Sequence, residues 1–185
     1  MDDVRVSAVL IVFASTHGHT AKVASRLARA LERDGTGVQV HDVASAEDLK
    51  PSDYDGVIVG ASIHGGRHQP EIVEWVRGHA ISLSGMPSAF FSVCLTAADD
   101  TEESRQATRD YLDDFLDDTG WTPARTASVA GALQYREYDF VTRLVMRVLM
   151  RRGEHPTDTT RDYEYTDWEA VDQFAHDFAA LLAAG

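Results

Sequence analysis

The chain has 185 residues, 44% of them hydrophobic and 25% charged, which suits one α/β domain with a sizeable core. Its formal net charge of −13 excludes a general affinity for nucleic acid. No apolar run reaches the roughly 18 residues of a transmembrane helix. The sequence opens without the pattern of a secretory signal, and Cys94 is its only cysteine, so no intrachain disulfide can form. We therefore expect a cytoplasmic protein.

The charged residues show a strong bias in residue type. Lys22 and Lys50 are the only lysines, the other basic residues are arginines, and aspartate dominates the acidic side. Adaptation to high salt, which we favour, and a GC-rich genome both account for this halophile-like composition. Neither explanation bears on the reaction.

The N-terminal half alternates between predicted strands and helices. Residues 6–13 form a nearly continuous apolar run, typical of a central parallel strand that is buried on both faces. After a polar stretch, apolar residues recur at helical spacing up to Leu31, and Gly35 and Gly37 end that helix. Further strands are predicted at 38–43 and 57–61, and Pro70 is predicted to open the next helix.

The C-terminal half continues the alternation. It predicts a strand at 88–93, an acidic helix at 101–119, a fifth strand at 126–130 and a last helix capped by Asp167. Alternating strands and helices indicate a five-stranded parallel sheet in the doubly wound order 2-1-3-4-5, with helices on both faces. Such sheets bind ligands at the carboxyl ends of their strands, near the point where the strand order reverses. We treat residues 1–185 as a single domain, with an inserted segment at about 134–162.

The polar loop after the first strand carries the strongest chemical signal. It reads Ser15-Thr16-His17-Gly18-His19-Thr20. Hydroxyl groups, backbone N–H groups and the positive end of the following helix can all bind a phosphate there, and Gly18 permits a close approach. The loop lacks both the lysine of the triphosphate-binding pattern and the glycine spacing of dinucleotide folds. It therefore favours a monophosphate, although an ordinary capped turn would have a similar sequence.

Two further loops are expected at the same edge of the sheet. They are Ala61-Ser62-Ile63-His64-Gly65-Gly66 and Ser92-Val93-Cys94-Leu95-Thr96-Ala97, and Gly131 ends the fifth strand beside them. A flavin ring could lie between these loops. Neither loop contains a Trp or Tyr that could sandwich the ring, so we expect an open ring face, which suits a bulky substrate.

Four histidines and the cysteine fall in or near these loops. We expect His64 and His68 near the ring and His17 and His19 near the phosphate. His64 either stacks on the ring or bonds to it, or is a half-exposed loop residue. Cys94 either contacts the flavin edge or, as we favour, is a small buried side chain. We predict no metal site, and no catalytic acid or base stands out.

Four stretches resemble a known family. They are Val59-Gly60-Ala61-Ser62-Ile63, Met86-Pro87-Ser88-Ala89-Phe90-Phe91-Ser92-Val93, Ala130-Gly131-Ala132-Leu133-Gln134-Tyr135 and Tyr165-Thr166-Asp167-Trp168-Glu169. From about Val9 to Leu181 the chain resembles the flavodoxin superfamily, and most closely its menaquinone-dependent protoporphyrinogen IX oxidase (dehydrogenase) family. The resemblance implies a flavodoxin-like fold, flavin mononucleotide (FMN) as cofactor, and oxidation of protoporphyrinogen IX with a quinone as acceptor. An NAD(P)H:quinone reductase and a non-enzymatic flavodoxin electron carrier are the alternatives.

Residues 138–152 suggest an amphipathic helix. Val141, Leu144, Val145 and Val148 share one helical face, and Arg143, Arg147 and Arg151 share another. A basic, apolar helix in such an acidic chain favours peripheral contact with an anionic membrane surface, where a lipid quinone resides. Binding of the substrate propionates by these arginines, or packing of the helix on its own domain, would also explain the pattern.

Overall fold

The computed structural model describes residues 8–133 and 163–184. Five parallel strands form the centre of the molecule: β1 (Ala8–Phe13), β2 (Gly37–Asp42), β3 (Gly56–His64), β5 (Ser88–Cys94) and β6 (Arg125–Ala130). They pair in the order β2-β1-β3-β5-β6. This confirms the predicted order of the parallel strands. The labels differ from 2-1-3-4-5 because a short antiparallel strand, β4 (Arg67–His68), pairs with the end of β3 and takes a number.

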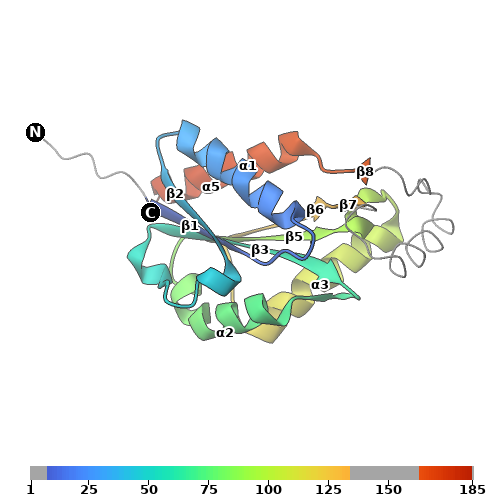
Figure 1. Cartoon of the computed structure of the whole chain (residues 1–185), viewed down its shortest axis with the longest axis horizontal. Coiled ribbons are helices and arrows are strands. Elements are labelled where there is room, and N and C mark those ends of the chain that lie inside the picture. Colours follow the sequence, from blue (N-terminus) through green and yellow to red (C-terminus); the bar gives the residue numbers. More distant parts are fainter. Residues whose placement is uncertain (1–7, 134–162, 185) are drawn as a thin grey trace, which may run out of the picture.

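Two layers of helices cover the sheet (Figure 1). The helices α1 (His19–Arg33) and α5 (Trp168–Ala184) pack on one face, and α2 (Pro70–Ser84) and α3 (Glu102–Thr119) pack on the other. Along β1, Val9 and Ile11 face the first layer, while Leu10 and Val12 face the second. All four side chains are fully buried, which explains the unbroken apolar run of this strand.

The middle of β3 requires a glycine. A Cβ atom on Gly60 would lie 2.1 Å from the ring of Phe91, which packs directly over this position from the neighbouring strand β5. The close packing of β3 and β5 fixes the two strand ends that later form one side of the site.

The third strand is longer than the sequence predicts. Residues 62–64, expected in a loop, continue β3 because Ile63 and His64 pair with His68 and Arg67 of β4. Gly65 and Gly66, with φ of 59° and 81°, make the two-residue turn of this hairpin, a backbone conformation that favours glycine.

The last helix begins as predicted. The side chain of Asp167 accepts hydrogen bonds from the backbone N–H groups of Glu169 and Ala170. Before it, β7 (Ala132–Leu133) and β8 (Tyr163–Glu164) form a small antiparallel pair that the sequence analysis did not predict. Residues 134–162, with Arg143, Arg147 and Arg151, lie outside the described residues, so the predicted membrane contact stays a prediction.

Candidate flavin site

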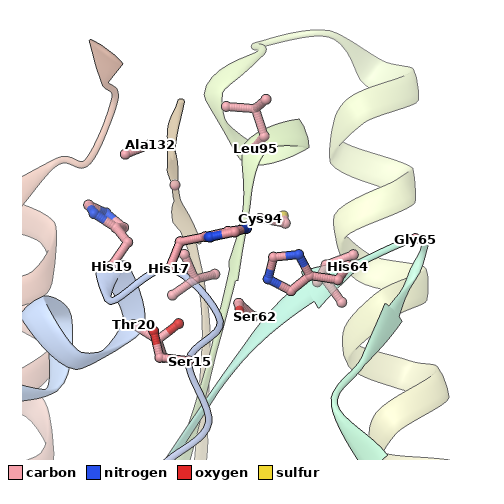
Figure 2. A pocket seen from close by; sticks show the side chains of 13 residues that line it. Ser15, His17, His19, Thr20, Ser62, His64, Gly65, Cys94, Leu95 and Ala132 are labelled. Carbon is pink, nitrogen blue, oxygen red and sulfur yellow. The ribbon is translucent and has the colours of Figure 1, made fainter. Parts of the chain in front are cut away.

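A cavity of about 260 Å³ opens where the carboxyl ends of the parallel strands meet (Figure 2). It lies at the edge of the sheet where the strand order reverses, between the chain segments that follow β1, β3, β5 and β6. We call it the switch-point cavity. Its lining residues are Ser15, His17, His19, Thr20, Ser62, Ile63, His64, Gly65, Val93, Cys94, Leu95, Gly131 and Ala132.

The α1 side of the cavity is polar and begins at a helix terminus. Gly18 is the N-cap of α1 with φ of 80°, and no side chain caps this end of the helix. Thr20 lies in the first helical turn and is 1% exposed. The positive end of the helix dipole therefore faces the cavity beside a buried hydroxyl group, an arrangement that binds anions.

Ser15 supplies the most informative atom on this side. Its Oγ is buried and has no hydrogen-bond partner among the described residues. A buried hydroxyl without a partner costs about 1–3 kcal/mol, so native proteins rarely retain one without a reason. Because Ser15 lines the cavity beside the α1 terminus, a phosphate oxygen in the cavity would satisfy this group.

A short chain of hydrogen bonds fixes the orientation of the His19 side chain. The hydroxyl of Thr166 donates to the carbonyl of Ala130 over 2.7 Å, and its oxygen lies 2.7 Å from His19 Nε2. Since that hydroxyl hydrogen is already used, Nε2 must carry a proton and donate. Burial lowers the pKa of His19, which favours the neutral ring. The first turn of α1 is thereby tied to the end of β6.

The opposite side of the cavity is formed by the β3–β4 hairpin and the end of β5. It presents the side chains of Ile63, Val93, Cys94 and Leu95 together with His64. The rings of His17 and His64 meet edge to face over the cavity, with centroids 5.4 Å apart (Figure 2). Loss of solvation, and secondarily the nearby His17, lowers the pKa of His64. Burial raises the pKa of the Cys94 thiol, which therefore stays protonated.

The cavity has no aromatic sandwich. Its lining in the described part of the chain contains no Phe, Tyr or Trp, and its ring side chains are those of His17, His19 and His64. A flat ligand seated between the loops would therefore be only partly covered by this side of the protein.

Five of the predicted site residues do not line the cavity. Gly18 caps α1, and Ala61 is fully buried in the core. Thr16 and Ser92 are hydrogen-bonded to Gln69 and His68 respectively, and Thr96 lies in the single turn of 3-10 helix that follows β5, Leu95–Ala98.

His68 was expected near the ring but lies elsewhere. Its Nε2 is 2.8 Å from Ser92 Oγ, and its ring packs edge-on against Phe90 and Phe115, beneath the hairpin. It pairs with Ile63 across the hairpin, whereas His64 pairs with Arg67, so the two histidines lie on different faces. Burial lowers the pKa of His68 to about 4.

The sequence analysis also missed three residues of this region. Ala132 lines the cavity from β7, Thr166 holds His19, and Gln69 bridges the first two loops. Only Gln69 has a local signal, since it directly precedes Pro70 at the start of α2 and so falls at the N-cap position.

Two features are absent from the described residues. Within 8–133 and 163–184, no group of three or more His, Cys, Asp or Glu residues is placed to hold a metal ion. None of the helices in these ranges is both long and apolar enough to span a bilayer.

Known proteins are similar to this chain in sequence over most of its length. The family model of a flavodoxin domain matches residues 10–160. The chain is 38% identical over 172 residues to the protoporphyrinogen IX dehydrogenase (quinone) of Escherichia coli strain K12, which covers 93% of this chain and 94% of that protein. A Leishmania major protein of the same name is 38% identical over 177 residues, or 95% of this chain and 76% of that protein.

A solved structure shows the same fold at lower identity. Oxidised flavodoxin 1 from Bacillus cereus has a TM-score of 0.56 over 94% of this chain and 98% of its own, with 20% sequence identity. The chemistry of the cavity is compatible with the flavin that a flavodoxin domain implies, since a helix terminus, hydroxyl groups and an apolar wall meet there.

Proposed function

We propose that this chain, which belongs to the flavodoxin domain family and is homologous to protoporphyrinogen IX dehydrogenases (quinone), oxidises protoporphyrinogen IX to protoporphyrin IX. FMN is the proposed cofactor and a quinone the proposed electron acceptor. The observation that carries this proposal is the 38% identity to the Escherichia coli enzyme over 93% of the chain. Homology of this extent makes a shared reaction the most economical expectation.

We assign the two sides of the switch-point cavity to two parts of the cofactor. Its phosphate end comprises Ser15, His19 and Thr20, with Thr16 and Gly18 of the same loop beside them, and its ring end comprises Ile63, His64, Val93, Cys94 and Leu95. The remaining proposed cofactor-binding residues are His17, Ala61, Ser62, Gly65, Ser92, Thr96 and Gly131. Ser15 Oγ, the α1 terminus and the Thr20 hydroxyl support the first assignment, because together they are suited to a phosphate.

When bound, FMN supplies a reversible two-electron acceptor. The protein's contribution is placement. The phosphate end would anchor the ligand, and the apolar side chains of Ile63, Val93 and Leu95 would exclude water from the ring end of the cavity. The neutral thiol of Cys94 adds no charge to that wall. The described lining contains no Phe, Tyr or Trp that would cover the ring, which favours access by a bulky tetrapyrrole.

The electron balance requires repeated turnover. Conversion of protoporphyrinogen IX to protoporphyrin IX removes six electrons and six protons, so one substrate molecule reduces three quinones to quinols by two electrons each. The site must therefore admit the tetrapyrrole and the quinone in alternation. The absence of Phe, Tyr and Trp from the described lining supports this sequence, because it favours access for two bulky reactants.

A steady-state assay tests the proposal. The FMN-loaded protein should form protoporphyrin from protoporphyrinogen under nitrogen only when a naphthoquinone is added, with about three quinones consumed per product. Rapid quinone reduction by NADPH without porphyrinogen turnover would instead identify an NAD(P)H:quinone reductase. Saturable electron transfer to a ferredoxin-type protein, with sluggish quinone reduction, would identify an electron carrier.

A further inference from the structure

Gln69 connects two loops of the site in a way that determines the direction of their hydrogen bonds. It lies on the return segment of the β3–β4 hairpin, just before α2. Its Oε1 accepts from the backbone N–H of Ser62 over 3.2 Å. Its Nε2 lies 2.6 Å from Ser62 Oγ and 3.3 Å from Thr16 Oγ1. One side chain therefore contacts the loop after β1 and the end of β3.

The orientation of this amide follows from its partners. A backbone N–H can only donate, so the atom of Gln69 that faces Ser62 N must be the oxygen. The amide nitrogen then faces the two hydroxyl groups, and an NH2 group can only donate. Both of its hydrogens are used, one by Ser62 and one by Thr16. Each hydroxyl oxygen is thus an acceptor toward Gln69.

This arrangement leaves both hydroxyl hydrogens available for another acceptor. Gln69 is the one side-chain partner of the Thr16 and Ser62 hydroxyls in the described part of the chain. Ser62 is 7% exposed and lines the switch-point cavity. Thr16 is exposed at the rim of the cavity, between Ser15 and His17, which line it. The free hydrogens are therefore available at a site whose proposed ligand offers only acceptors at its phosphate and its ring carbonyls.

We propose that Gln69 is a positioning residue that fixes the hydroxyls of Thr16 and Ser62 as hydrogen-bond donors to the bound flavin. The inference rests on the proposed FMN site. It differs from a purely structural role, in which Gln69 would merely hold the two loops together. The distinction is testable, because a carboxylate at this position keeps the loops linked but reverses the hydrogen bonds.

The Q69E variant makes that reversal. The introduced carboxylate still accepts from Ser62 N–H, but it offers no hydrogen to the hydroxyls. Thr16 and Ser62 must then donate to the carboxylate and can no longer donate to the ligand. A lost donor to a charged phosphate weakens binding by about 10- to 150-fold. The new negative charge also repels the phosphate, so the Kd of Q69E alone does not separate the two effects.

A double-mutant cycle removes the repulsion from the comparison. The Kd of FMN for the apoprotein is measured by flavin fluorescence for wild type, T16V, Q69E and T16V/Q69E. Repulsion by the carboxylate is common to the last two proteins and cancels. We expect T16V to weaken binding by about tenfold or more in the wild-type background and by less than about threefold in the Q69E background. The Q106E variant on α3, with the same charge change at an exposed site, should bind FMN like wild type.

Two results would contradict the inference. If T16V weakens binding by the same factor in both backgrounds, Gln69 does not orient Thr16 and the inference fails, while the FMN site stands. If the wild-type apoprotein does not bind FMN, the proposed function fails and this inference fails with it. Should T16V/Q69E not fold, judged by its thermal unfolding, the same cycle with S62A in place of T16V applies the same criterion.

Discussion

The phosphate end and the ring end of the switch-point cavity differ in the kind of groups that they present to a ligand. At the phosphate end, a helix terminus, a buried hydroxyl and a hydrogen-bonded His19 supply polar groups. At the ring end, apolar side chains and the exposed His64 line the cavity from the end of β5 and from a hairpin that turns on two glycines. We therefore expect affinity for the proposed cofactor to reside mainly at the first end and access for reactants at the second.

Removal of hydroxyl donors from the phosphate end should have the largest effect. In T16V/T20V, two hydroxyl groups are lost while the side-chain shapes are nearly kept. Each lost bond to a charged phosphate costs about 1.5–3 kcal/mol, so FMN affinity should fall by about 3–6 kcal/mol. Equilibrium titration of the apoprotein measures this. The matched T126V variant, on the exposed end of β6, should bind FMN normally. Unchanged affinity in the double variant would remove this loop from the site.

The stability that buried His68 contributes next to the ring end should depend on pH. Because burial lowers the pKa of His68 to about 4, the unfolded chain takes up this proton near pH 6.5 and the folded chain only near pH 4. The stability that depends on neutral His68 is thus complete above pH 6.5 and is lost as the pH falls toward 4. Between pH 6.5 and 4, we expect the free energy of unfolding to fall by about 3 kcal/mol less in His68→Gln than in wild type.

Urea unfolding at several pH values provides the test for His68. The difference in stability between wild type and His68→Gln should shrink or reverse in favour of the variant as the pH falls. A parallel pH dependence of wild type and His68→Gln would contradict the account of His68 as a buried, neutral residue.

Ser15→Ala should change affinity and stability in opposite directions. The substitution removes a hydroxyl that bonds to the proposed phosphate, so FMN affinity should fall by about 1.5–3 kcal/mol. It also removes a buried group without a partner, so the apoprotein should gain about 1 kcal/mol of stability. Titration and thermal unfolding of the same samples measure both. Loss of apoprotein stability would mean that Ser15 is structural.

The smallest effect on affinity is expected at the ring end. His64 is exposed and approaches the edge of the His17 ring. We therefore expect His64→Ala to change FMN affinity by less than about 1 kcal/mol, while the rate of quinone reduction changes. Stopped-flow reoxidation with a naphthoquinone measures that rate. A tenfold or larger loss of FMN affinity would place His64 among the anchoring residues and blur the distinction between the two ends.

The sequence predicts the scaffold well because its signals are local. Runs such as Val9 to Val12 indicate strands buried on both faces, and the order of strands and helices along the chain then limits the sheet to few arrangements. The same order places three loops at one edge, so most of the cavity lining was predictable. These predictions needed no knowledge of side-chain contacts.

The contacts between distant residues could not be predicted in this way. Gln69 bonds to Thr16, and His19 is held by Thr166, across separations of 53 and 147 residues. The sequence prediction for His68 was wrong because the turn at Gly65 and Gly66 reverses the chain. His68 therefore pairs with Ile63 and lies on the face of the hairpin opposite to His64. Periodicity identifies the elements but not which polar side chains meet across them.

Anaerobic mixing of the FMN-loaded protein with protoporphyrinogen IX tests the central claim most directly. The visible absorbance of the flavin is followed in a stopped-flow instrument, without quinone or oxygen. The account predicts bleaching of the flavin at a rate that saturates with porphyrinogen, and return of the absorbance when a naphthoquinone is added. A flavin that porphyrinogen leaves oxidised, but that NADPH or a reduced protein partner bleaches readily, would contradict it.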